Sequence, residues 1–282
     1  MKEEKSYPDI RPCGDRALTI EFGDAIAPDI NDRVFDLYHR MLASPPEGLT
    51  WMVPSFASLL VEFDPDRTSL RALSEVLLRE AEGTADPEER NAAGGISPEK
   101  KTSGGAKGRK GRASAKAVPS PRRIWEIPCC YSERFAPDLP SVAEHAGLTE
   151  EEVVRLHCSA DYRIYMLGFL PGFVYLGGLD PRIACPRLPS PRKKIPKGAV
   201  GIGGSQTGIY PLESPGGWRL IGSTPVPMYD PSREDPVFCR PGDFIRFVPI
   251  TTCDYYDIAG DYRRGLWKPA SHECGSLGNS DI

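Results

Sequence analysis

The sequence predicts an α+β protein with an N-terminal two-layer α/β sandwich domain and a second, compact all-β domain of the barrel type. Three observations predict this division. Residues 11–82 alternate between strand and helix patterns, and residues 84–123 contain almost no large apolar side chain. Residues 161–225 hold short apolar runs between glycine- and proline-rich turns, which is typical of a small barrel with short strands.

The N-terminal domain, residues 1–83, has the pattern β-α-β-β-α. Leu18, Ile20 and Phe22 alternate with polar residues, as in a half-buried strand. Apolar residues at helical spacing follow Pro28, and a second helix follows a cap at Thr68 or Ser69. Two further strands are predicted between them, at 51–53 and 58–63. This order favours helices on one face of a mainly antiparallel sheet.

The segment 84–123 is predicted to be a disordered linker. It is rich in glycine, serine and lysine, and it buries too little apolar surface to offset the entropy of ordering. Its basic cluster, Lys100 to Lys116, leaves two interpretations open: a solvated tether, which we favour, or a weak contact with acidic surfaces or RNA.

The second domain is predicted over 124–267, with a flexible tail at 268–282. A strand at 124–131 precedes a short helix at 138–146. Thr149 and Glu152 have capping-box spacing at the start of a helix that runs to His157. A closing strand is expected at 244–248, after the turn at Pro241 and Gly242.

The composition indicates an ordinary soluble protein. The 282 residues carry a formal net charge of −4, which argues for neither a nucleic-acid nor a membrane partner. No run approaches the roughly 18 apolar residues of a membrane span, and residues 1–5 lack the apolar core of a signal peptide, so a cytoplasmic location is expected. The eight cysteines form no C-x-x-C pair, so we expect most of them to be buried apolar thiols and expect no metal site.

Glycine-rich runs dominate the barrel segment. Gly203 to Gly208 and Ser214 to Trp218 bring backbone N–H groups and polar side chains together, as a small-molecule site requires. Barrel corners without any ligand are also rich in glycine. From composition alone, both interpretations stay open.

Several long motifs then resemble the carboxyltransferase subdomain C/D family, which includes KipI, allophanate hydrolase subunit 1 and the B-type subunit of 5-oxoprolinase (PxpB). The motifs occur in both domains, and the linker has no counterpart that we recognise. They are GDRALTIEFG at 14–23, IPCCYSERFAPDL at 127–139, LHCSADYRIYMLGFLPGFVYLGGL at 156–179, PRKKIPKGAVGI at 191–202, QTGIYPLESPGGWRLIG at 206–222 and RPGDFIRF at 240–247. The chain departs from the family at Ser223, where Arg is expected, and at Ser205, where Gly or Ala is usual.

The resemblance implies a cyclophilin-like β-barrel and a role as one subunit of a hydrolase. In the bacterial 5-oxoprolinase, this subunit acts with a homologous C-type subunit (PxpC-like) and an A-type component (LamB/YcsF-like). Together they open the lactam 5-oxo-L-proline to L-glutamate with hydrolysis of ATP, and we expect the chain to be inactive alone. We also expect its glycine-lined face to be half of a pocket that a second polypeptide completes. The alternatives are a KipI-like inhibitor of a sensor histidine kinase and a subunit of a urea carboxylase or allophanate hydrolase system.

The expected cofactor is ATP with Mg²⁺, bound either in a manner specific to the family or across the subunit interface. The sequence contains no G-x-x-x-x-G-K-[ST] loop, so no ATP site is assigned by motif. It also contains no Met-Lys-Met, so biotin has no attachment site in this chain.

Two residues are candidates for catalysis. His157 titrates near neutrality in its unperturbed state and is a candidate proton shuttle, although a histidine at a helix end also interacts with the helix dipole. Arg163 lies in an alternating strand pattern and is a candidate for holding a carboxylate. Its alternative role is an ion pair with Asp161 or Glu213.

The remaining candidates are assigned to binding. Arg192 and Lys194 are candidates for phosphate binding, unless they belong to an exposed charged turn. Ser214 lacks G-x-S-x-G and is not a nucleophile, while Tyr210 and Trp218 have an alternative role as barrel core. The substrate-binding candidates are Gln206, Thr207, Tyr210, Ser214, Gly216 and Trp218.

Overall fold

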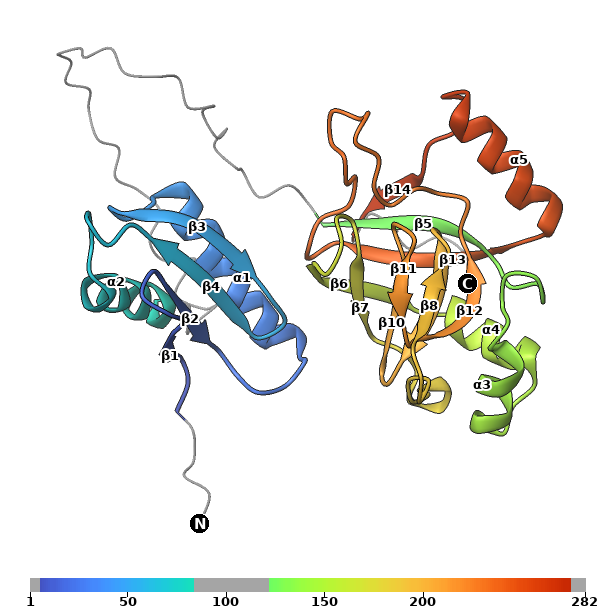
Figure 1. Ribbon diagram of the computed structural model, residues 1–282, viewed down its shortest axis with the longest axis horizontal. Helices are drawn as coiled ribbons and strands as arrows, with labels where there is room; N and C mark the ends of the chain where they lie inside the picture. Colours follow the sequence, from blue (N-terminus) through green and yellow to red (C-terminus); the bar gives the residue numbers. More distant parts are fainter. Residues whose placement is uncertain (1–5, 84–121, 275–282) are drawn as a thin grey trace. The chain divides into compact units, whose positions relative to one another are not determined.

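The computed structural model describes residues 6–83 and 122–274 (Figure 1). The chain divides into two compact units, residues 1–120 and residues 121–282. The predicted linker falls almost entirely outside the described residues.

The N-terminal unit is a two-layer structure, as predicted. Its sheet is antiparallel throughout, in the order β1-β2-β4-β3. Alternating residues of β2 and β4 face the helices and form one core with Val34, Leu37 and Leu77. The elements are β1 (Asp9–Pro12), β2 (Ala17–Glu21), α1 (Pro28–Ala43), β3 (Leu49–Pro54), β4 (Ser58–Phe63) and α2 (Leu70–Glu82).

Of the two cap candidates for α2, Ser69 is the one used. Its hydroxyl accepts a hydrogen bond from the backbone N–H of Ala72, which satisfies one unpaired donor of the first turn. Strand β1 is an addition to the predicted pattern, because its four residues, Asp9 to Pro12, show no apolar alternation.

The second unit contains a closed seven-stranded barrel, which confirms the predicted fold class. The strands follow the order β12-β9-β10-β7-β6-β13-β5, and a pairing of Ser223 with Cys130 joins β12 back to β5. The strands are β5 (Arg123–Cys130), β6 (Asp161–Leu167), β7 (Val174–Gly177), β9 (Ala199–Gly203), β10 (Gln206–Ile209), β12 (Arg219–Ser223) and β13 (Phe244–Ile250).

Helices α3 (Leu139–Ala146) and α4 (Glu150–Cys158) cover one end of the barrel (Figure 1). The capping box at Thr149 is present: its hydroxyl accepts from the Glu152 N–H, and the Glu152 carboxylate accepts from the Thr149 N–H. Val153 and Leu156 of α4 join the apolar core inside the barrel.

A two-stranded ribbon lies outside the barrel sheet. It consists of β8 (Arg192–Ile195) and β11 (Ser214–Gly216), which pair antiparallel. A one-turn 3₁₀ helix at Pro181–Ile183 precedes it. Ile195 of the ribbon packs on an apolar cluster on the outer face of the barrel, which we call the outer cluster. Its members are Phe173, Ile195, Ala199, Tyr210, Trp218 and Leu220, with Leu170 and Tyr175 packed against them.

Two elements after the barrel differ from the predictions. Helix α5 (Thr252–Arg263) has no buried residue, so it lacks the apolar period that marks most helices. The predicted tail is wrong at its start, because Ala270–Glu273 form strand β14, paired with the edge of β5. Backbone pairing, rather than any apolar pattern, holds this strand.

The cysteines are only partly as expected. Cys129, Cys130, Cys185 and Cys239 are buried. Three others, Cys13, Cys253 and Cys274, are exposed, and all eight thiols are free.

Candidate functional site

His157 lies inside the barrel and is fully buried. Its Nδ1 lies 2.8 Å from the Tyr131 hydroxyl, and its Nε2 lies 2.9 Å from Thr207 Oγ1. Thr207 donates to the Gly201 carbonyl at 3.1 Å, so its oxygen accepts from His157 Nε2–H. Nδ1 therefore accepts from Tyr131 O–H, and the imidazole is neutral with its proton on Nε2.

This environment gives His157 a structural role. Burial lowers the pKa of the imidazole to about 3, and both ring nitrogens already have protein partners. A proton shuttle must change its charge near the working pH and reach a reacting group. The structure gives the predicted shuttle neither property, because the barrel interior excludes water and favours the neutral ring.

The predicted phosphate-binding residues are both engaged with carboxylates. Arg192 forms two hydrogen bonds with Asp138, at 2.8 and 2.7 Å, and Asp138 also accepts from the Leu220 N–H. Lys194 pairs with Glu213 at 2.9 Å on an exposed part of the ribbon. In this arrangement Arg192 holds β8 to the start of α3, so these residues do not fit a phosphate clamp.

Arg163 is buried on the outer face of β6, and its guanidinium carbon lies 5.5 Å from the ring centroid of Tyr165. The carboxylates predicted as its alternative partners bind other residues. Asp161 binds Arg246 through two hydrogen bonds of 2.6 and 2.7 Å, while Glu213 pairs with Lys194.

The glycine-lined face is filled by the chain's own side chains. Val200 and Ile202 point into the barrel core, so Gly201 and Gly203 face outward, toward Trp218. A Cβ atom at Gly203 would lie 2.5 Å from the Trp218 indole, and one at Gly208 would lie 2.9 Å from it. The expectation that this face is an open half-pocket is therefore wrong at Gly203 and Gly208, because the indole occupies that space.

Tyr210 and Trp218 are buried members of the outer cluster. They therefore have the alternative role predicted for them, that of core residues. Their ring centroids lie 6.4 Å apart, in an edge-to-face arrangement. Gly216 is required beside them, since a Cβ atom there would lie 2.6 Å from the Tyr210 hydroxyl. These residues pack against one another and do not line an open cavity.

Two predicted residues have buried polar atoms without a partner among the described residues. They are Gln206 Nε2, on the outer face at the start of β10, and Ser214 Oγ, on the ribbon. A buried donor without an acceptor costs about 1–3 kcal/mol, so such atoms often mark the place of a ligand. Of the predicted set, Gln206 best fits a binding role, because its side chain is only half-buried.

The structure adds two residues that sequence reasoning missed, Arg187 and Tyr175. Arg187 is exposed, and its guanidinium carbon lies 5.8 Å from the ring centroid of Trp218. Tyr175 is half-buried and its ring contacts Phe173 and Trp218, with centroids 4.8 and 6.4 Å apart. The basic residues within 187–194 are a sequence signal for anion binding that includes Arg187. This signal does not distinguish Arg187 from Arg192 or Lys194.

The two residues that depart from the family pattern, Ser223 and Ser205, lie in different environments. Ser223 is buried, and its hydroxyl lies 3.3 Å from that of Tyr255 on α5, so α5 occupies space that an Arg side chain would need. Ser205 is exposed at the turn between β9 and β10.

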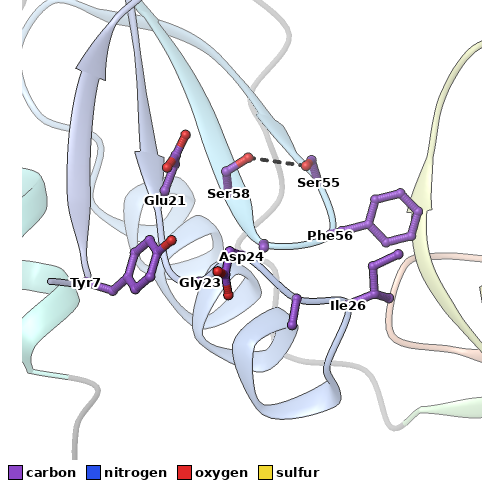
Figure 2. A pocket seen from close by; sticks show the side chains of 10 residues that line it. Tyr7, Glu21, Gly23, Asp24, Ile26, Ser55, Phe56 and Ser58 are labelled. Atoms are coloured by element: carbon purple, nitrogen blue, oxygen red, sulfur yellow. Dashed lines mark hydrogen bonds between the residues drawn. The ribbon is translucent and has the colours of Figure 1, made fainter. Parts of the chain in front are cut away.

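A separate hollow of about 400 Å³ lies in the N-terminal unit. Figure 2 shows Tyr7, Glu21 and Asp24 around it, with the Ser55 and Ser58 hydroxyls 3.3 Å apart. The buried Asn31 amide donates to the carbonyls of Ser55 and Phe56, both at 3.1 Å, and so fixes the turn that borders the hollow. The sequence predicted no chemistry in this unit.

Residues 6–83 and 122–274 contain no group of three metal-ligating side chains. None of the helices in these ranges has the length and apolar character needed to cross a membrane.

A two-layer unit followed by a barrel is the fold of carboxyltransferase-type domains, which is the class of this protein. The family model for carboxyltransferase domain, subdomain C and D, matches residues 8–98 and 103–239. The chain belongs to this family.

Proteins with similar sequences include B-type subunits of 5-oxoprolinases and a urea amidolyase. The chain is 38% identical over 259 residues to the B-type subunit of the Bacillus subtilis 5-oxoprolinase, covering 88% of this chain and 95% of that one. It is 50% identical over 135 residues to the B-type subunit of the Escherichia coli O157:H7 5-oxoprolinase, covering 48% of this chain and 62% of that one. It is 30% identical to the urea amidolyase of Saccharomyces cerevisiae, over 92% of this chain but only 14% of that protein.

Solved structures share the fold. The crystal structure of TTHA0988 superposes with a TM-score of 0.64 at 36% identity, over 83% of this chain and 40% of that one. The chain thus spans about two fifths of that protein. The Kluyveromyces lactis urea amidolyase superposes with a TM-score of 0.70 at 21% identity, over 97% of this chain and 17% of that one, which shows the fold alone.

Proposed function

We propose that the chain is the B-type subunit of a 5-oxoprolinase, which opens 5-oxo-L-proline to L-glutamate together with a homologous C-type subunit and an A-type component. One observation carries the proposal: the 38% identity to the B-type subunit of the Bacillus subtilis 5-oxoprolinase extends over nearly the whole length of both chains. The urea amidolyases match only as a small part of a much longer protein.

The outer face of the barrel supports binding of a small lactam. Opening a lactam near neutral pH requires hydrogen-bond donors for the negative charge that develops on its carbonyl oxygen. The Gln206 Nε2 atom is a donor without an acceptor among the described residues, and the half-buried ring of Tyr175, on the neighbouring strand β7, gives an apolar surface near it. The chain's contribution is to bind and orient the lactam.

We assign the nucleotide mainly to the partner subunits. ATP with Mg²⁺ needs cations for its phosphates, and the two candidates for this role in β8 are each neutralised by a carboxylate. The chain has no phosphate-binding loop. Both observations support activity of the complex and inactivity of the isolated chain.

The proposal is tested by reconstitution. The purified chain is mixed with its C-type and A-type partners, and 5-oxoproline-dependent release of ADP is measured together with glutamate formation. We expect release that needs all three components and that stops when urea replaces 5-oxoproline. Release no greater than in the mixture without this chain would contradict the proposal.

A further inference from the structure

The backbone on both sides of Arg187 is anchored next to the outer cluster. The Pro186 carbonyl accepts from Arg219 Nε at 3.1 Å, and the Leu188 N–H donates to the Gly217 carbonyl at 2.7 Å. Both contacts tie the segment around Arg187 to the backbone next to Trp218. From this backbone position the guanidinium lies over the indole, with its carbon 5.8 Å from the ring centroid.

The charge of Arg187 is not neutralised within the described parts of the chain. No carboxylate of residues 6–83 or 122–274 lies within salt-bridge distance of it. Its basic neighbours differ in this respect: Arg182 pairs with Asp180, and Arg192 pairs with Asp138. An exposed guanidinium with an apolar ring below it is available for an anion.

Two tyrosines lie within the electrostatic range of Arg187. Burial raises the pKa of both Tyr175 and Tyr210, and the positive charge of Arg187 opposes that rise. Both phenols thus keep their protons at neutral pH. Leu176 and Thr207 are paired and face the core, so Tyr175 and Gln206 project to the same outer face of neighbouring strands.

We infer that Arg187 binds the carboxylate of a small ring-shaped acid whose ring lies against the half-buried Tyr175 and whose carbonyl reaches the Gln206 amide. A guanidinium binds a carboxylate through two parallel hydrogen bonds, which fixes the orientation of the acid. Because the Gln206 side chain is half-buried, rotation of its terminal amide is sufficient to turn a donor toward that carbonyl. The identity of the acid as 5-oxoproline rests on the proposed function, whereas the preference for a carboxylate rests on the geometry.

The inference is tested by comparing 5-oxo-L-proline with 2-pyrrolidinone, the same lactam without the carboxylate. Binding of each to the full chain, alone and with the C-type subunit, is measured by isothermal titration. The variants are Arg187→Met, which removes the charge but keeps an unbranched side chain, and Arg187→Lys. The matched control is Arg182→Met, an exposed arginine five residues away that pairs with Asp180.

We expect the wild-type chain and Arg182→Met to bind the acid at least tenfold more tightly than the neutral lactam. Arg187→Met should abolish this preference, and Arg187→Lys should keep part of it. A wild-type chain with no preference in either setting, or an Arg187→Met chain that retains it, would overturn the inference. ADP release separates the two proposals: if turnover occurs while Arg187→Met leaves binding unchanged, only this inference fails, and if binding follows Arg187 without turnover, only the proposed function fails.

Discussion

At the scale of single residues, the barrel interior converts a reactive side chain into a structural one. His157 donates to Thr207, accepts from Tyr131, and packs against Phe247 with ring centroids 4.5 Å apart. Cys158 extends the chain of hydrogen bonds, since its thiol donates to the Tyr131 oxygen at 3.4 Å. Such a network stabilises the fold only while every member has a partner.

The buried imidazole predicts a loss of stability in acid. Its pKa is about 3 in the folded state and about 6.5 in the unfolded chain, so only the unfolded state gains a proton between these values. The His157 contribution is fully present above pH 6.5 and falls by about 1.4 kcal/mol per pH unit below it, to a loss of about 2 kcal/mol at pH 5. Urea unfolding from pH 7.5 to pH 5 measures this slope.

His157→Gln should lose this part of the pH dependence. It should also be less stable at pH 7.5 by about 1–3 kcal/mol, because Tyr131 or Thr207 loses its partner. The control His145→Gln, at an exposed position of α3, should keep the wild-type slope. An unchanged slope in His157→Gln would contradict the assignment.

At the scale of elements, one buried carboxylate joins three parts of the second unit. Asp138 precedes α3, binds Arg192 of β8, and accepts from the Leu220 N–H of β12. The close approach of neighbouring elements also depends on glycines at particular positions. Gly203 of β9 has room for no side chain, because the Trp218 ring lies against it.

Loss of the Asp138–Arg192 pair should loosen the ribbon. Arg192→Met is expected to reduce the free energy of unfolding by about 2–3 kcal/mol, less than a fully buried pair because Arg192 is partly exposed. Arg182→Met, which breaks the exposed pair with Asp180, should leave stability unchanged. Equal effects of the two substitutions in chemical unfolding would show that the ribbon does not depend on Asp138.

Two glycine substitutions should act in opposite directions. Gly203→Ala places a methyl group against the Trp218 ring and should destabilise the protein by about 1–3 kcal/mol. At Gly260, within α5, an added methyl group would lie 3.9 Å from the nearest side-chain atom, so Gly260→Ala should stabilise the protein by up to about 1 kcal/mol through helix propensity. Thermal unfolding measures both, and a Gly203→Ala variant as stable as the wild type would show that the indole moves freely.

At the scale of the whole molecule, each of the two units has its own apolar interior. The core of the N-terminal unit includes Leu59 and Val61, and the core of the barrel includes Ile164 and Ile221. Among the described residues, none belongs to both of these cores.

Separate cores predict separate responses to a cavity. Leu59→Ala should cost about 2–5 kcal/mol and speed hydrogen exchange in β2 and β4 while leaving β6 and β9 protected. Ile221→Ala should do the reverse. Peptide-level hydrogen exchange with mass spectrometry distinguishes these outcomes, and faster exchange in both units after either substitution would show that they unfold together.

The sequence by itself determined the local elements and their class. Short-range signals depend on neighbouring residues only. They include the alternation at Leu18, Ile20 and Phe22, the cap at Thr68 or Ser69, the capping box at Thr149, and the turns of residues 161–225. They are enough to predict a two-layer unit followed by a barrel. Helix α5 and strand β14 lack an apolar period, so no such signal marks them.

Only the tertiary structure decided which polar residues remain available to a ligand. His157, Arg192 and Lys194 are reactive or charged in isolation, but their partners Thr207, Asp138 and Glu213 lie 50, 54 and 19 positions away in the sequence, respectively. Arg187 has the same chemistry as Arg192, yet it lies over the Trp218 ring without a carboxylate among the described residues. Burial and pairing are set by long-range contacts, so local patterns identify the chemical candidates and the fold selects among them.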